Sequence, residues 1–108
     1  MYYARLVIFK LGAGQRQVGE QLTKKFDKVS RILSGFRGSV YFFDDLECEY
    51  RALNYWDTKA DAEQAHEILH PKFENELKKY SKEKPTYKIL EVYDASEDSD
   101  VLISHIKI

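Results

Sequence analysis

The strands that this sequence predicts carry apolar or aromatic side chains on both faces, and this feature constrains the fold more than any other. Between Leu33 and Ala65 the chain contains two such runs, at residues 40–44 and 49–56. A sheet that is wet on one side alternates apolar and polar residues instead. Both sheet faces must therefore be covered, and a chain of 108 residues has helices enough for only one. The sequence thus predicts that another copy of the chain covers the second face.

The strands follow from runs of apolar residues that end at glycine or at short polar segments. In the first strand, residues 2–9 are apolar on both faces apart from Arg5. The second and third strands are joined by a polar turn of four residues, which indicates an antiparallel hairpin. The strands are expected over residues 2–11, 36–44, 48–56 and 84–95, with a short alternating tail strand over 101–108.

Two helices are expected between these strands. The first covers residues 15–33, and Gly19 inside it costs about 1 kcal/mol relative to Ala, a tolerable defect. The second begins at Thr58 with a capping-box-like sequence, Thr-Lys-Ala-Asp. Pro71 disfavours helix at the residue before it, so we expect a kink or two short helices that meet near His70. The apolar stripes consist of Val18, Leu22, Phe26, Val29 and Leu33, and of Ala62, Ala65, Leu69, Phe73, Leu77 and Tyr80.

The order β-α-β-β-α-β predicts an α+β fold with a ferredoxin-like, split β-α-β sheet that is antiparallel. Both helices must lie on one side, because β-α-β crossovers within a sheet are right-handed. The opposite face is apolar and bare, which predicts a two-fold homodimer with the sheets face to face. Residues 1–95 form the domain, and residues 96–108 form an acidic link and a C-terminal strand that packs on its own sheet or on the partner's.

Composition excludes several classes of function. The formal net charge is -1 and the pI is near 6.3, which gives no general attraction to nucleic acid or to an anionic membrane. No apolar run approaches the roughly 20 residues of a membrane span, and the N-terminus does not resemble a signal peptide. Cys48 is the only cysteine, so no disulfide forms within the chain. Together these features favour a cytoplasmic protein.

The segment from His66 to His70 matches the H-E-x-x-H motif of zinc proteases. That spacing places two imidazoles on one helical face and a glutamate beside the metal-bound water. Pro71 follows at once, where the helix of a zinc protease is regular, and no third ligand stands at a familiar spacing. We therefore expect no metal, with His66 at the border of the core and His70 at the kink.

Several of these features together resemble the antibiotic biosynthesis monooxygenase domains of the dimeric α+β barrel superfamily. They are Gly-Phe-Arg-Gly at residues 35–38, Tyr50, and Tyr-Trp-Asp-Thr-Lys-Ala-Asp-Ala at residues 55–62. The resemblance covers about residues 2–94. It implies a dimeric barrel with a pocket between sheet and helices in each protomer. Such domains include monooxygenases of phenols and quinols that need no cofactor, haem-degrading enzymes, and members of no known role.

The haem-degrading branch of that superfamily is disfavoured. It uses an Asn in the first strand and a Trp and a His on the second helix. In this chain the Asn position falls at or near Val7 and the Trp position near Ala65. The His position falls near Asn75 or Glu76, so all three residues are absent. No cofactor is therefore expected.

A cofactor-free oxygenation requires a base and a hydrogen-bond donor in a dry cavity, because the substrate must become an electron-rich anion before it reacts with oxygen. His66 and Asn54 are the candidate catalytic residues, with neutral His66 able to take a phenol proton. The ligand would be a small aromatic molecule. The candidate substrate-binding residues are Trp56, Arg5, Tyr50, Phe9 and Leu69.

Each of these assignments has a structural alternative. His66 can be a partly buried structural histidine, and Trp56 can be core. Arg5 needs a carboxylate, a ligand anion or an exit to solvent, and we expect a protein carboxylate such as Glu91. Because no complete catalytic constellation is present, a non-catalytic dimer that binds a small ligand or stabilises a partner stays open beside the enzyme hypothesis.

Overall fold

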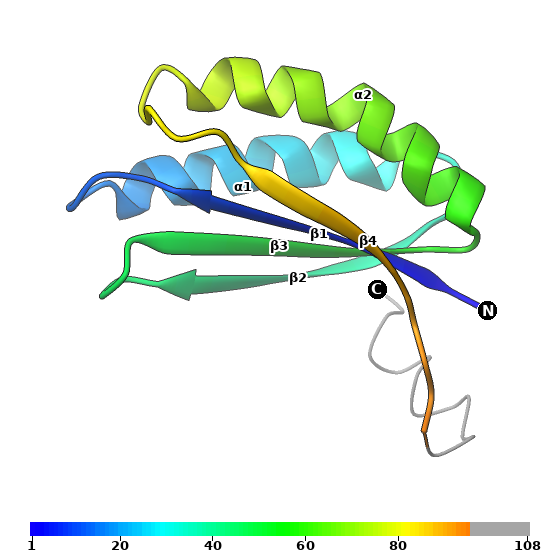
Figure 1. The fold of residues 1–108 in the computed structure, drawn as a ribbon. Coiled ribbons are helices and arrows are strands. Elements are labelled where there is room, and N and C mark those ends of the chain that lie inside the picture. Colours follow the sequence, from blue (N-terminus) through cyan, green and yellow to red (C-terminus); the bar gives the residue numbers. More distant parts are fainter. Residues whose placement is uncertain (96–108) are drawn as a thin grey trace.

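The computed structural model describes residues 1–95 and consists of one four-stranded sheet with two helices (Figure 1). The order along the sheet is β2-β3-β1-β4, and each neighbouring pair is antiparallel. This confirms the predicted ferredoxin-like α+β fold. The predicted acidic link and tail strand lie outside the described residues. The elements are β1 (Tyr3–Lys10), α1 (Arg16–Arg31), β2 (Phe36–Asp44), β3 (Glu49–Trp56), α2 (Lys59–Leu77) and β4 (Thr86–Glu91).

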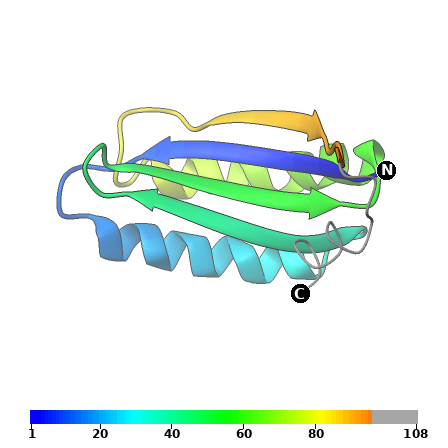
Figure 2. The ribbon, with the colours of Figure 1, turned by 90° about the horizontal axis from the view of Figure 1, so that it is seen from below.

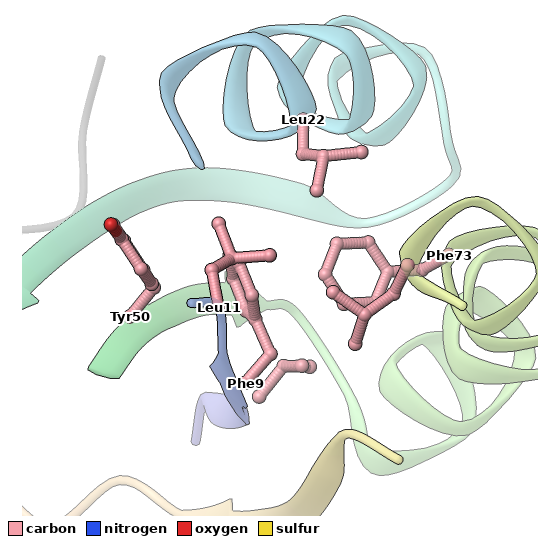
Figure 3. Packing of buried hydrophobic residues seen from close by; sticks show 7 residues of the cluster. Phe9, Leu11, Leu22, Tyr50 and Phe73 are labelled. Carbon is pink, nitrogen blue, oxygen red and sulfur yellow. The ribbon is translucent and has the colours of Figure 1, made fainter. Parts of the chain in front are cut away.

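Both helices pack on the same face of the sheet, as the handedness of the crossovers requires (Figures 1 and 2). The odd-numbered residues of β1 face the helices, and Val7 and Phe9 are buried there. They form one core cluster with residues of α1, α2 and β3, in which Phe9 stacks on Tyr50 and meets the edge of Phe73 (Figure 3). The members of this cluster are Val7, Phe9, Leu11, Leu22, Tyr50, Phe73 and Leu77.

A second cluster surrounds Trp56, whose side chain is completely buried. Its other buried members, Ala62, Ala65 and Leu69, come from α2. The ring of Phe36 meets the indole edge to face at 5.4 Å between centroids. The expectation that Trp56 belongs to the core is therefore confirmed.

No described element covers the opposite face of the sheet, which Figure 2 shows in front of the helices. The strand register places Leu6, Leu53 and Val40 side by side across three strands on this face. Phe42 and Leu90 also lie on it, with 51% and 44% of their surface exposed. The centre of this face is apolar, as the sequence predicted, while Arg51 and Lys88 lie on the same face beside Ile8 and Leu6. None of the helices in the described part is long and apolar enough to cross a membrane.

The second helix differs from the prediction because it is continuous through Pro71. Its start is as expected, since the Thr58 hydroxyl accepts a hydrogen bond from the backbone N–H of Asp61 at 3.0 Å. An internal proline costs about 3 kcal/mol. Leu69 and Phe73, on either side of it, are both buried in the core. Burial of such side chains contributes about 1.5–3 kcal/mol each, which is enough to hold one helix instead of two.

Strand β4 is shorter than predicted, at Thr86–Glu91 instead of residues 84–95. It lies at the edge of the sheet and pairs only with β1, between Tyr3 and Ile8. One further backbone hydrogen bond, from Val92 to Tyr2, continues the pairing. Strand β4 therefore ends close to the residue where its backbone pairing with β1 ends.

Gly19 is required by packing and is not the tolerable defect that helix propensity suggests. A Cβ atom built on Gly19 would lie 2.7 Å from Cε1 of Tyr50. The Tyr50 ring is 2% exposed and is held between the rings of Phe9 and Phe43. It cannot move aside without disturbing the core, so α1 can approach the sheet here only with glycine.

We therefore predict that Gly19→Ala destabilises the protein by about 1–3 kcal/mol, because the overpacked methyl group outweighs the gain of about 1 kcal/mol in helix propensity. Urea unfolding followed by circular dichroism measures the change. Gln21→Ala, at an exposed position of the same helix, is the control and should change stability by less than about 0.5 kcal/mol. An unchanged or raised stability of Gly19→Ala would contradict the packing argument.

Candidate functional site

The most unusual side chain of the core is Arg5, which is 4% exposed and projects from β1 towards α2. Its Nε donates a hydrogen bond to Nδ1 of His66 and its Nη1 donates one to Oδ1 of Asn54, both at 3.1 Å. The prediction that Arg5 forms an ion pair with Glu91 is wrong. The register places Glu91 opposite Tyr3, where it is exposed.

Within the described residues, Arg5 is thus a buried cation without an ion-pair partner. No carboxylate of residues 1–95 forms an ion pair with Arg5. Burial lowers the pKa of its guanidinium to about 10, although the nearby phenols of Tyr41 and Tyr87 act in the opposite direction. The group still carries its proton at neutral pH. A buried charge of this kind is costly unless something neutralises it, and a bound anion would do so.

Arg5 lies on the wall of a cavity between the sheet and both helices. The cavity has a volume of about 40 Å³, which is room for very few water molecules. Its apolar wall consists of Val7, Phe9, Leu22, Phe26, Ala52, Leu69 and Phe73. Its polar wall consists of Arg5, Thr23, Asp27, Ser30, Tyr41 and Asn54. A mainly apolar space with a few convergent polar groups is the usual form of a small-molecule site.

His66 is neutral, and its Nδ1 accepts the hydrogen bond from Arg5. Burial, the Arg5 charge and His70 lower the pKa of His66 to about 4, so the imidazole is neutral at neutral pH. Because Nδ1 accepts from Arg5, the proton of the neutral ring is on Nε2. The predicted role of His66 as a base conflicts with this arrangement, since its one acceptor nitrogen is already used.

The two histidines of the H-E-x-x-H segment stack and do not converge on a metal. Their ring centroids are 4.5 Å apart, and Tyr87 stacks on His66 from β4 at 3.7 Å. Burial also lowers the pKa of His70, and its buried Nδ1 atom has no hydrogen-bond partner among the described residues. Within residues 1–95 no group of three or more possible ligands could hold a metal ion.

A second polar group lies on the α1 side of the cavity, and sequence analysis missed it. The Tyr41 hydroxyl donates to Oδ1 of Asp27, while Nε of Arg31 donates to Oδ2 of the same carboxylate at 2.7 Å. Burial, and then the hydrogen bond to Asp27, raise the pKa of Tyr41. The available signal was a polar stripe of Thr23, Asp27 and Ser30, at helical spacing beside the apolar stripe of α1.

The structure separates the predicted site residues into three groups. Arg5, Asn54, Phe9 and Leu69 line the cavity, and His66 reaches it only through Arg5. Tyr50 packs in the first core cluster. Trp56 packs in the second, where its indole N–H has no partner among the described residues.

Asn54 uses both of its polar atoms to build this site. Its Oδ1 accepts from Arg5, and its Nδ2 donates to Oγ of Ser39 at 3.2 Å. Because the residue is 3% exposed, neither bond can be replaced by solvent. Asn54 therefore fixes the direction in which Arg5 presents its remaining donors.

Comparisons with known proteins agree with this architecture. No protein-family profile matches the chain, and no curated protein matches it by sequence. Solved structures do match. Rv0793 from Mycobacterium tuberculosis superposes with a TM-score of 0.71 at 10% identity, over 90% of this chain and 100% of that one. A candidate antibiotic biosynthesis monooxygenase from Deinococcus radiodurans gives 0.71 at 13% identity, over 88% and 95%.

A third similar structure is that of a mutant of SnoaB, a cofactor-independent oxygenase from Streptomyces nogalater. It superposes with a TM-score of 0.70 at 13% identity, over 90% of this chain and 98% of that one. At such low identity these likenesses establish the fold. They confirm that the chain has the fold of the antibiotic biosynthesis monooxygenase domains, as its sequence indicated.

The arrangement around Arg5 predicts an unusual titration of His66. We expect its imidazole to titrate near pH 4, and Arg5→Met to raise that pKa because the adjacent positive charge is removed. NMR chemical shifts of the ring protons against pH measure it. His66→Gln identifies the resonance. A wild-type pKa near the ordinary value of about 6.5 would show that Arg5 and His66 are not in contact.

The same lowered pKa predicts how stability depends on pH. The folded state disfavours protonated His66, whereas the unfolded chain protonates it below about pH 6.5. Stability is therefore expected to fall as pH decreases from about 6.5 towards 4. Unfolding midpoints in urea across this range measure the loss, and it should be smaller in His66→Gln.

Proposed function

We propose that this protein is a cofactor-independent monooxygenase that acts on a small aromatic substrate, a phenol or quinol, between the sheet and the helices. The observation that carries the proposal is the buried Arg5 guanidinium, which borders the cavity and forms no ion pair with a carboxylate of residues 1–95. The fold shared with SnoaB, a cofactor-independent oxygenase, supports the same chemistry.

In this proposal Arg5 receives the oxyanion of the ionised substrate. A phenolate or quinolate is electron-rich enough to react with oxygen, and a buried cation stabilises it strongly where water is excluded. Asn54 orients the guanidinium and His66 supports it from the other side. Phe9 and Leu69 belong to the apolar wall of the cavity, which helps to exclude water.

Binding of an aromatic ring requires the cavity to expand. Its volume of about 40 Å³ is well below the roughly 150 Å³ of an apolar cavity that holds benzene. The rings of Phe26 and Phe73 lie edge to face between the two helices, 5.2 Å apart. We propose that these two rings move aside when the substrate enters.

The second candidate function is a non-catalytic dimer, and the small cavity is the observation that favours it. A filled interior is what a structural module would have. In that case Arg5 and its partners would bind a small anion or only fix the packing of β1 against α2. Turnover separates the two candidates.

We predict that the protein consumes oxygen with at least one member of a panel of quinols and polyphenols, and that Arg5→Met lowers the rate by about 10²–10³-fold. An oxygen electrode measures the rate. Arg16→Met is the matched control, because Arg16 forms an exposed ion pair with Asp45 at the surface. Absence of turnover with every compound would favour the non-catalytic dimer.

We also propose that the bare sheet face forms a homodimer, because it presents apolar residues from all four strands. Phe42→Glu places a charge in that interface and should convert the dimer to monomer, since burying an unpaired charge is costly. Ile32→Glu is the control, with its side chain 84% exposed beyond the end of α1. Analytical ultracentrifugation measures the oligomeric state of the wild type and of both variants. A wild-type monomer at micromolar concentration would refute the proposal.

A further inference from the structure

The polar wall of the cavity has two sides. One side carries the positive charge of Arg5, and the other carries Tyr41 and Asp27. Arg5 comes from β1 and is held by Asn54 and His66. Tyr41 comes from β2 and is held by Asp27 of α1. The Arg5, Tyr41 and Asp27 side chains line the same cavity of about 40 Å³.

The two sides are electrostatically close. Burial has the largest effect on the pKa of Arg5, and among neighbouring charged groups the phenol of Tyr41 has the largest. Because the cavity is small, a single hydroxyl group bound within it can lie near both the guanidinium and the Tyr41 oxygen. One side can therefore stabilise an oxyanion while the other receives the proton.

The remaining groups of the cavity do not offer a base. His66 uses its acceptor nitrogen for Arg5, and Asn54 and Ser30 are not bases. The Ser30 hydroxyl donates to the backbone carbonyl of Phe26. Among residues 1–95, Asp27 is the one carboxylate on the cavity wall, and its Oδ1 accepts the hydrogen bond from the Tyr41 hydroxyl.

We propose that Tyr41 and Asp27 form a proton relay and that the ligand is a phenol which ionises inside the cavity with its oxygen on Arg5. This inference rests on the proposed function, because it assumes that an aromatic hydroxyl compound binds there. Tyr41 is the residue that touches the ligand, and Asp27 acts through it.

The step involves protons only and is balanced. The O–H bond of the bound phenol breaks and its proton moves to the Tyr41 oxygen, while the Tyr41 proton moves to Oδ1 of Asp27. The negative charge leaves the Asp27 carboxylate and appears on the phenolate oxygen beside Arg5. No electron moves, and no proton is released to solvent.

Because the relay releases no proton to solvent, it can be tested by counting protons, without turnover. The probe is 4-nitrophenol, whose phenolate absorbs visible light, added without oxygen at a pH where the free probe is mostly neutral. Absorbance counts bound phenolate, and a pH-stat counts released protons. In the wild-type protein we expect the phenolate band with about zero protons released per bound probe. In Asp27→Asn and Tyr41→Phe we expect either no phenolate band or about one proton released per phenolate formed.

Lys28→Gln is the matched control, because it removes an exposed positive charge from the same turn of α1 and leaves Asp27 with its Tyr41 and Arg31 partners. It should behave as the wild type does. Release of about one proton per bound phenolate by the wild type, or identical behaviour of the two relay variants and the wild type, overturns the relay while the aromatic pocket stands. Failure of the wild type to bind the probe overturns the pocket itself, and the relay with it.

Discussion

The structure depends on keeping water from both faces of one thin sheet. Helices α1 and α2 dry one face through two clusters, around Phe9 and around Trp56. The other face carries exposed apolar side chains such as Phe42 and Leu90, with no covering element among residues 1–95. Burial of this second face would contribute roughly 25 cal/mol for each Å² removed from water, which is the driving force for the proposed dimer.

Arg5 is the one charged residue in the fully buried class among residues 1–95, and its hydrogen-bond partners are neutral. A protein that needed Arg5 only for stability would pair it with a carboxylate or replace it by an apolar residue, since buried ion pairs add little stability. Here an amide and an imidazole hold the guanidinium in place without neutralising it. That combination preserves a positive electrostatic potential at the cavity, which is the property that an anionic intermediate requires.

Local sequence preferences predicted the helices and strands well. They failed where the free energy of tertiary packing is larger than that of the local preference. Pro71 lies inside a continuous helix because Leu69 and Phe73 are both buried against the sheet. Gly19 looked like a weak point of α1, yet it is the position that admits the Tyr50 ring. In both cases a local preference of about 1–3 kcal/mol is outweighed by contacts between residues distant in sequence.

The sequence by itself determined the α+β topology, the two-sided apolar sheet and the candidate importance of Arg5, because periodicity and turn chemistry are local and the charge stands out in an apolar strand. Only the tertiary structure decided what Arg5 contacts and which groups share its cavity. Asp27 and Tyr41 were not found in advance, since each is unremarkable in its own segment. Their meeting depends on how closely α1 packs over β2, and that distance is set by the whole core.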